Sequence, residues 1–414
     1  MNDVLEEARC VLDEGDVCDY CLGRRFATLS YGLSNRERGK AVRTAVALED
    51  DDEFEDAASD DCWVCDGAFT RLDDWAERVV ESLEGYDFDN FLVGTRTPPL
   101  VEENESLLDS ICGDDNAKSF RHDYNREVGK RVGEKVGKDV EFERPDVVGI
   151  LNLQEDEVEV QINPVFIYGR YRKLERGIPQ TEWPCRDCGG RGCERCDGTG
   201  YMYDESVEEI IRPHVIEATE GDEMVFHGAG REDVDAKMLG SGRPFVAEVK
   251  EPRVRRPGLD EIRQKVNGTG KVEVEDLHFV TRDTVERVKS LDSSKRYRAK
   301  VVFSEEVSDD ELDDALSEIE GEIEQRTPDR VSHRRADKVR RREVYDAEGE
   351  TEDETTATVE VHGTGGLYIK ELISGDGGRT NPSLSGLLGV DAEVESLDVV
   401  DVIGDYLKDD YIKE

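Results

Sequence analysis

Residues 230–245 read Gly230-Arg-Glu-Asp-Val-Asp-Ala-Lys-Met-Leu-Gly-Ser-Gly-Arg-Pro-Phe245, and they set three carboxylates between basic residues in a glycine-rich loop. Apolar residues predict a strand directly after this loop, at 245–249. Further strands are predicted at 224–226, 297–303, 357–361 and 392–400. Strands that return with few helices between them favour a mainly antiparallel sheet in an α+β domain.

Capping boxes mark two helix starts in this C-terminal region. The stretches that begin at Ser206 and Ser308 each carry a glutamate three residues later, which is a signal for a helix N-terminus. Pro213 is expected to kink the first of these helices. The acidic residues 346–355 are predicted to form a hairpin tip or loop.

The N-terminal half mixes helices with short strands. Leu72, Trp75, Val79 and Leu83 recur at helical spacing. The other expected elements are a strand at 91–93, a helix carrying Val128, Val132, Val136 and Val140, and paired strands at 147–153 and 158–162. These elements predict an α/β domain that ends near residue 168.

The composition is strongly acidic. The 414 residues include 100 Asp and Glu against 55 Lys and Arg, and the formal net charge is -45. The excess is spread from end to end, a pattern that indicates adaptation to concentrated salt, in which like-charge repulsion is screened. Two or three domains are expected at this length.

Location follows from what the chain lacks. No apolar run approaches the ~18–20 residues of a membrane span, and the first fifteen residues are acidic, unlike a signal peptide. A cytoplasmic protein without a membrane partner is therefore expected.

Eight of the ten cysteines fall in Cys-x-x-Cys pairs, which in a reducing compartment favours metal over disulfides. The first predicted zinc site comprises Cys18, Cys21, Cys62 and Cys65. A possible second site comprises Cys185, Cys188, Cys193 and Cys196, in two tandem Cys-x-x-Cys-x-Gly-x-Gly units. Buried or redox cysteines are the alternative to zinc. Cys10 and Cys112 are expected to be ordinary buried thiols.

Asp233 stands out by its neighbours. Basic and apolar residues surround it, and such a setting can keep a carboxylate ionised and make it a usable nucleophile. The alternative is an arginine-rich turn closed by ion pairs.

Three downstream segments offer partners. Tyr297 lies among bases in Lys295-Arg-Tyr-Arg-Ala299, a pattern suited to stacking on a nucleobase, although an amphipathic edge strand is equally compatible. The densest basic run, from Arg326 to Arg342, includes Arg334 and Arg335 and indicates a polyanion site. The glycine-rich stretch 363–380 contains three further candidates, Tyr368, Lys370 and Arg379. It lacks the nucleotide-binding P-loop pattern.

Together these segments resemble the archaeal-type tRNA pseudouridine synthases that act on positions 54 and 55 of the TΨC arm. The likeness covers nearly the whole chain. It includes the N-terminal cysteine pairs, an RNA-binding THUMP-like domain, Ile167-Tyr-Gly-Arg-Tyr-Arg-Lys173, Arg176-Gly-Ile-Pro-Gln-Thr181, the 230–245 window, Lys295-Arg-Tyr and Gly375-Asp-Gly-Gly-Arg-Thr380. The implied domains are a zinc module at 1–70, a THUMP-like domain at 71–168 and a catalytic domain at 169–414 with a Cys-rich insert at 183–200.

The resemblance also implies residue roles. Asp233 is the expected nucleophile, with Glu232 and Asp235 as supports, and Lys370 faces it as a cation. Tyr297 is expected to stack on the target base. The expected substrate contacts are Tyr297, Tyr368, Arg231, Arg334, Arg335 and Arg379. Lys370 or Arg231 is expected to hold the Asp233 carboxylate.

The implied reaction isomerises a uridine that has left its stack. It requires no organic cofactor, so zinc would be structural; tRNA is the partner, and no obligate protein partner is evident. Two other classes remain open: a non-catalytic, zinc-stabilised RNA-binding protein or tRNA chaperone, and an RNA methyltransferase. The methyltransferase is disfavoured because no strand followed by Gly-x-Gly-x-x-Gly is present.

Overall fold

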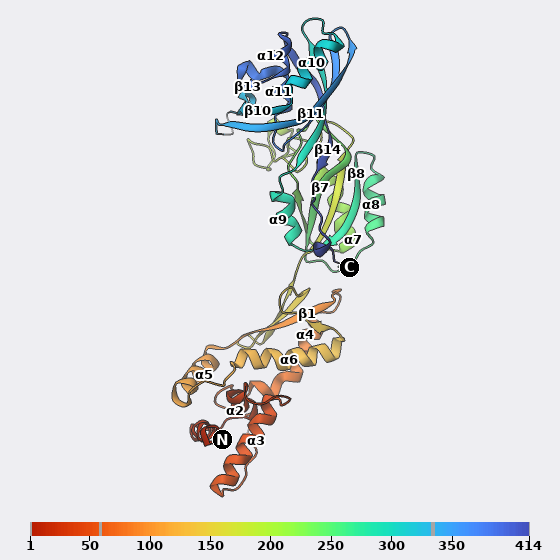
Figure 1. Ribbon diagram of the computed structural model, residues 1–414. Coiled ribbons are helices and arrows are strands. Elements are labelled where there is room, and N and C mark those ends of the chain that lie inside the picture. Colours follow the sequence, from red (N-terminus) through yellow and green to blue (C-terminus); the bar gives the residue numbers. More distant parts are fainter. Residues whose placement is uncertain (1, 58–59, 333–335, 414) are drawn as a thin grey trace. The chain divides into compact units, whose positions relative to one another are not determined.

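The computed structural model describes residues 2–57, 60–332 and 336–413 (Figure 1). The chain divides into two compact units, Met1–Asn163 and Pro164–Glu414. The boundary lies just before strand β5 (Val165–Lys173), which pairs with two strands of the second unit. The predicted boundary after residue 168 would divide that strand. No helix of the described residues is long and apolar enough to cross a membrane.

The first unit combines helices with a four-stranded mixed sheet of order β2-β1-β3-β4. Its helices are α1 (Asn2–Asp13), α2 (Asp19–Gly23), η1 (Arg24–Phe26), α3 (Asn35–Asp50), η2 (Ala68–Arg71), α4 (Leu72–Ser82), α5 (Pro99–Cys112) and α6 (Phe120–Val136). Its strands are β1 (Asn90–Arg96), β2 (Asp139–Val140), β3 (Val147–Asn152) and β4 (Glu157–Ile162). One continuous hydrophobic core, from Ala8 to Ile162, joins the cysteine-bearing segments to this sheet.

Two expectations for this unit were wrong. The helix that was to carry Val140 ends earlier, because Gly137 adopts a left-handed conformation (φ 67°) that closes α6, and Val140 lies in β2. Cys10 and Cys112 are not free buried thiols. They are half-buried and form a disulfide that links α1 to α5.

The second unit is built on a ten-stranded sheet of order β13-β10-β11-β12-β9-β14-β7-β5-β8, with β6 added beside β7. All pairs of neighbouring strands in this sheet are antiparallel except the pair β7 and β14, which is parallel. The predicted α+β class with a mixed, mainly antiparallel sheet is therefore confirmed. The remaining strands are β6 (Glu223–Gly228), β7 (Lys237–Lys250), β8 (Val272–Val280), β9 (Ser294–Phe303), β10 (Gly321–Arg326), β11 (Val339–Asp353), β12 (Thr356–Gly363), β13 (Thr380–Asn381) and β14 (Ala392–Ile403).

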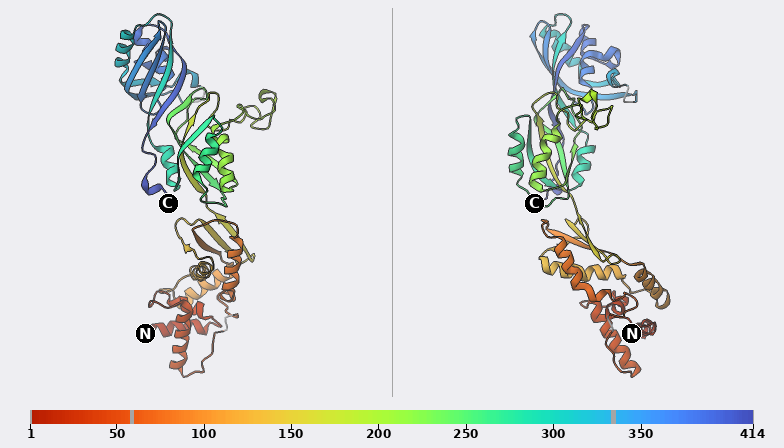
Figure 2. Two further views of the ribbon diagram at one scale, coloured as in Figure 1. Left: turned by 90° about the vertical axis from the view of Figure 1, so that its right-hand side faces the viewer. Right: turned by 180° about the vertical axis from the view of Figure 1, so that it is seen from behind.

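Helices flank this sheet in two groups (Figures 1 and 2). The first comprises α7 (Val207–Thr219), α8 (Leu259–Asn267) and α9 (Asp283–Ser290), and the second comprises α10 (Asp309–Ile319), α11 (Ile369–Ser374) and α12 (Leu384–Leu388). Short helical turns are η3 (Glu194–Cys196), η4 (Asp329–Val331), η5 (Gly375–Gly378) and η6 (Asp409–Tyr411). Both predicted capping serines, Ser206 and Ser308, accept a backbone N–H at their helix starts.

The acidic stretch 346–355 is mostly strand, against the prediction of a hairpin tip or loop. β11 continues to Asp353 and pairs with β12 up to that residue, so only 354–355 form the predicted hairpin tip. A strand with one exposed face can carry carboxylates at alternate positions, so acidity alone was a poor signal for a turn here.

The sheet contains a seam between two hydrophobic cores. One core gathers residues of β5, β7, β8 and their helices, and the other gathers residues of β9–β12 and theirs. Tyr297 packs against both. Across the seam, β7 and β14 pair in parallel at only two positions, Lys237 with Asp398 and Val399 with Met238. Gly240 permits this close approach, since a Cβ there would lie 1.8 Å from the Val400 carbonyl oxygen.

Candidate active site

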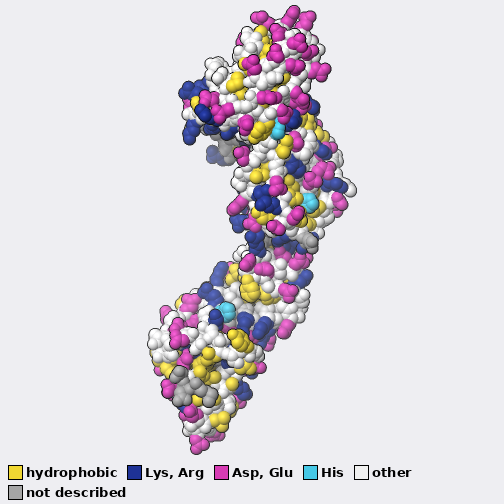
Figure 3. Space-filling model, in the orientation of Figure 1, with side chains coloured by type: hydrophobic (Ala, Val, Ile, Leu, Met, Phe, Trp, Pro, Cys, Tyr) yellow, Lys and Arg dark blue, Asp and Glu magenta, His cyan; other side chains and the backbone are white. Residues whose placement is uncertain are grey.

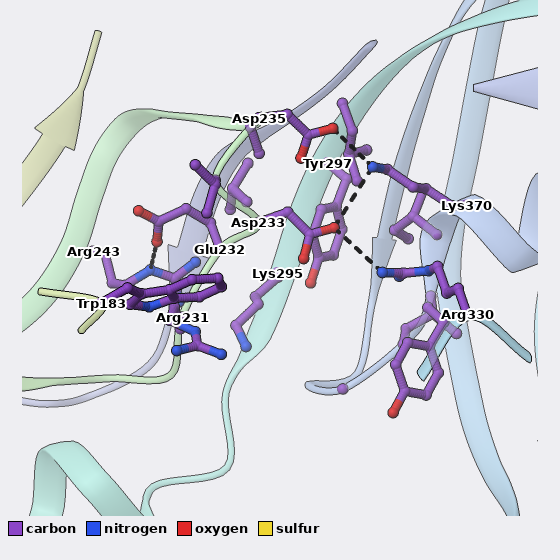
Figure 4. Close-up of a pocket in the computed structure, with 18 residues that line it drawn as sticks. Trp183, Arg231, Glu232, Asp233, Asp235, Arg243, Lys295, Tyr297, Arg330 and Lys370 are labelled. Atoms are coloured by element: carbon purple, nitrogen blue, oxygen red, sulfur yellow. Dashed lines mark hydrogen bonds and ion pairs between the residues drawn. The ribbon is translucent and has the colours of Figure 1, made fainter. Parts of the chain in front are cut away.

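A cleft of about 610 Å³ lies at this seam. Its lining combines the loop before β7, strand β9, turn η4 and the start of α11, so it draws on both halves of the sheet (Figure 4). The 230–245 window forms one wall. The fold therefore brings together residues that are more than a hundred positions apart in sequence.

Asp233 projects into the cleft between two cations. Its Oδ2 lies 3.7 Å from Lys370 Nζ and 3.8 Å from Arg330 Nη1. The carboxylate is 45% exposed, so it remains open to a ligand while being held by charge. The family resemblance predicts Lys370 in this role, whereas the sequence marks Arg330 only as part of the basic run.

Asp235 competes for the same lysine. Lys370 Nζ donates a hydrogen bond to Asp235 Oδ2 at 3.0 Å, which is shorter than its distance to Asp233. Partial burial raises the pKa of Asp235, but the hydrogen bond and charge of Lys370 outweigh it and lower that pKa overall. Asp235 is thus a firmly ionised anchor for Lys370.

Arg330 is aimed by a buried carboxylate. Its Nε donates to Glu371 Oε1 at 2.6 Å, and Glu371 is only 6% exposed. Glu371 follows Lys370 directly in α11, so one short helix positions both cations that face Asp233. No sequence pattern singled out Glu371.

Beneath the loop lies a fully buried ion pair. Arg243 Nε donates to Glu232 Oε2 at 2.7 Å, and Arg243 Nη1 donates to the Ala229 carbonyl at 2.8 Å. The Tyr171 hydroxyl also donates to Glu232, at 2.9 Å, and itself accepts a hydrogen bond from Gln180. Glu232 is therefore a structural support, because its buried carboxylate already accepts hydrogen bonds from Arg243 and Tyr171.

Lys173 fixes the backbone of Asp233 and of the residue that follows it. This buried ammonium donates to the carbonyls of Ile178 (2.7 Å), Asp233 (3.2 Å) and Val234 (3.1 Å). Burial lowers its pKa, while Glu232, 3.8 Å away, acts in the opposite sense. Tyr171 and Lys173 belong to the 167–173 segment noted for its resemblance, which was the available signal for this support.

Tyr297 and Lys295 form the floor of the cleft from β9. Desolvation raises the pKa of Tyr297 to about 12, so its ring presents a neutral phenol. Desolvation and the nearby Arg243 lower the pKa of Lys295 to about 8. An aromatic face beside a carboxylate and several cations suits a planar, polar ligand with an attached anion.

Arg231 does not hold Asp233 in this arrangement. Its guanidinium lies over the Trp183 ring, 5.2 Å from the centroid, at one end of the cleft (Figure 4). No sequence pattern indicated Trp183, although it is the first residue of the Cys-rich insert.

The other expected contacts are placed as follows. Tyr368 lines the cleft, where its backbone exchanges two 2.9 Å hydrogen bonds with the Gln325 side chain. Arg379 is not among the cleft-lining residues that the structure describes; it donates to the Thr327 carbonyl and to Asp337. Arg334 and Arg335 lie outside the described residues.

Both cysteine groups are compact enough to hold a metal ion. In each group the four Sγ atoms lie within 4.8 Å of one another. A zinc ion with four bonds of ~2.3 Å would separate its sulfurs by about 3.8 Å. The Sγ distances that bear on this are Cys18–Cys65 at 3.9 Å, Cys185–Cys193 at 3.8 Å, Cys188–Cys196 at 3.9 Å and Cys193–Cys196 at 3.7 Å.

The second group also shows why its glycines are needed. Gly200 has φ 83°, and a Cβ on it would lie 2.4 Å from the Gly190 carbonyl oxygen. Its N–H donates to Cys196 Sγ at 3.2 Å, and the Gly192 N–H donates likewise to Cys188 Sγ. Backbone donors aimed at sulfur suit thiolates, so this donor set fits a metal although its inner loop is short.

Comparison with known proteins supplies the family. Residues 166–403 match the family described as Pus10, C-terminal, and residues 75–152 match the archaeal Pus10 THUMP domain. The chain is 55% identical over 414 residues to the tRNA pseudouridine synthase Pus10 of Halorubrum lacusprofundi, covering 97% of each chain. It is 48% identical to that of Methanothrix thermoacetophila, covering 97% of this chain and 95% of the other.

A solved structure described as a Cbf5-Nop10-Gar1 complex is a distant match, with 17% identity, a TM-score of 0.32 and coverage of 56% of this chain and 48% of the other. The sequence matches define an isomerase that acts as a tRNA pseudouridine synthase and carries a THUMP domain. The chain belongs to the Pus10 family, as a salt-adapted member. This membership sets aside the non-catalytic and methyltransferase alternatives.

Proposed function

We propose that this enzyme converts the uridines at positions 54 and 55 of the tRNA TΨC arm to pseudouridine, with Asp233 as the nucleophile. The observation that carries the proposal is the Asp233 carboxylate, half-exposed between Lys370 and Arg330 in a cleft that Tyr297 also lines. The two tRNA positions follow from the family resemblance alone.

The chemistry exchanges one bond for another within the same nucleotide. The C1′–N1 bond breaks, its electron pair stays on the uracil, and a C1′–C5 bond forms; C5 then loses its proton and N1 gains one. Asp233 either attacks the sugar or assists a glycal-like intermediate. Lys370 and Arg330 lie within 4 Å of its carboxylate and hold it in place, and the neutral phenol of Tyr297 stacks on the detached uracil.

Reaching the target requires that the uridine leave its stack, at a cost of a few kcal/mol. The THUMP domain and the zinc-binding module of the first unit would bind the tRNA elsewhere. The binding free energy gained there would offset the cost of flipping the uridine. Because its substrate is tRNA, we propose that the enzyme acts in the cytoplasm. The decisive assay incubates the protein with unmodified tRNA transcript in high salt and maps pseudouridine. Absence of the product at both positions would refute the assignment.

Zinc content gives a separate test. The wild-type chain is expected to bind about two zinc ions, since each Cys₄ group fits one. Cys18→Ser and Cys185→Ser should each remove one of them. The measurement is a metal-to-protein ratio by atomic absorption after gel filtration. A ratio of one that only Cys18→Ser lowers would exclude metal at the second group.

The dependence of binding on salt should be shallow. Carboxylates cover much of the visible surface, and the Lys and Arg side chains that gather beside β10 and β11 are partly paired, as in Arg326 with Asp337 (Figure 3). Counterion release at phosphates therefore contributes less, and stacking and hydrogen bonds contribute more. Titrations across the molar range should show a smaller loss of tRNA affinity than for a more basic relative. An equally steep loss would contradict this.

A further inference from the structure

We propose that Trp183 stacks on a nucleobase adjacent to the target uridine, and that Arg231 supports this second base position and meets its phosphate. The proposal rests on the proposed function of the same cleft. A uridine that flips into a pocket stays covalently joined to its neighbours, so an adjacent nucleotide must lie at the mouth of that pocket.

Trp183 is placed for such a contact. It is half-buried and lines the same cleft as Asp233 and Tyr297. Its ring packs edge-on against Tyr203, with centroids 5.4 Å apart, and lies near the Arg231 guanidinium. In Figure 4, Trp183 and Arg231 lie at one end of the cleft and Arg330 at the other, with Asp233 between them.

Arg231 is one of several cations in the described part of this acidic chain that have no acidic partner. It is exposed, yet among residues 2–57, 60–332 and 336–413 no carboxylate forms an ion pair with it. Acidic residues outnumber basic ones by 100 to 55, and the neighbouring cations Arg330 and Lys370 are both paired. A planar cation stacked beneath an indole and lacking a carboxylate partner is suited to a nucleobase and its phosphate.

The Cys-rich segment holds the backbone of Trp183. The Met202 N–H donates to the Trp183 carbonyl at 2.9 Å, Pro184 pairs with Tyr201, and the Cys185 N–H donates to the Gly200 carbonyl at 2.7 Å. Figure 2 shows this segment standing out from the sheet. Among the described residues, the buried apolar cluster of this segment consists of its cysteines alone. A metal bound to these cysteines would therefore fix the segment and, with it, the position of the Trp183 indole.

The first experiment measures steady-state kinetics of the full-length, metal-loaded enzyme on unmodified tRNA. Trp183→Ala is expected to raise KM about tenfold, with a smaller change in kcat, because stacking on an aromatic contributes mainly to binding. Trp183→Phe should restore most of the affinity. The matched control is Tyr201→Ala, since Tyr201 is an exposed aromatic of the same segment that does not line the cleft. It should behave as wild type.

The second experiment needs binding only. A stem-loop RNA carries 2-aminopurine on the 5′ side of the target uridine, and another carries it on the 3′ side. Quenching of one of the two probes is expected with wild type, Trp183→Phe and Tyr201→Ala, and its loss is expected with Trp183→Ala. Zinc content, measured for each variant, identifies any that has lost the Cys-rich segment.

The results separate this inference from the proposed function. An unchanged KM and an unchanged 2-aminopurine signal in Trp183→Ala overturn the stacking role, even where the wild type is active at both positions. Equal losses in Trp183→Ala and Tyr201→Ala also overturn it, because they indicate only the integrity of the segment. Failure of the proposed function would instead appear as an absence of pseudouridine at both positions in the wild type, whatever the probe reports.

Discussion

Replacing Asp233 by asparagine is expected to abolish pseudouridine formation, with a loss on the order of 10⁴-fold or more in the single-turnover rate, while tRNA binding is retained. The substitution keeps the shape of the side chain but removes the charge that faces Lys370 and Arg330. Losses of this size are typical when a nucleophile is removed from a preorganised site. The measurement combines product mapping on unmodified tRNA with a binding titration.

Asp235→Asn is the matched control for this substitution. Asp235 lies two residues away and contacts the same lysine, but it is 70% exposed and hydrogen-bonds that lysine directly. We expect a loss of about tenfold to a hundredfold, because Lys370 would be less well placed but the nucleophile would remain. If Asp233→Asn stays active, or if Asp235→Asn is the more damaging change, the assignment of the nucleophile is wrong.

Removing the arginine beneath the loop should cause the largest loss of stability. Arg243→Ala would leave the fully buried Glu232 without its strongest partner, and breaking a buried pair in this way costs roughly 3–5 kcal/mol. The two units need not unfold together, so a global midpoint would be ambiguous. Hydrogen exchange of peptides from β5 and β7, measured against denaturant in high salt, reports the affected half of the sheet.

A surface pair provides the comparison for that stability test. Arg172 donates to Glu273 at 2.8 Å, but both side chains are one-third exposed. Arg172→Ala should therefore cost less than ~1 kcal/mol. Equal effects of Arg172→Ala and Arg243→Ala on exchange would show that the ion pair beneath the loop is not a special support of the site.

Local signals in the sequence predicted most of the elements. The capping serines at 206 and 308, the helical spacing of Leu72 and Trp75, and the alternation at 158–162 each depend on neighbours within a few residues. The errors arose where a local pattern was ambiguous. Valines at fourfold spacing continued past Gly137, and acidic residues were read as a turn although they alternate along β11.

The site was predicted only in part, for a different reason. Resemblance supplied Asp233, Tyr297 and Lys370, and the fold brings all three to one cleft. The contacts between Arg330 and Glu371, and between Glu232 and Arg243, depend on three-dimensional register that composition does not encode. The disulfide was missed because Cys10 and Cys112 are 102 positions apart and the expected cytoplasmic location implied a reducing environment.

The seam in the sheet affects how this enzyme can tolerate substitutions during evolution. Asp233 lies on the loop before β7, whereas Lys370 and Arg330 lie in α11 and η4. The two cores are linked by Tyr297, by the short β7–β14 pairing and by β14 itself, whose residues contribute to both. Substitutions in one core should therefore have little effect on the other, provided that the β7–β14 pairing keeps its register. Chimaeras that exchange one half of the ten-stranded sheet between relatives should therefore lose activity by misalignment of the reacting groups more often than by unfolding. Substitutions that restore their activity should lie in the β7–β14 pairing or next to Tyr297.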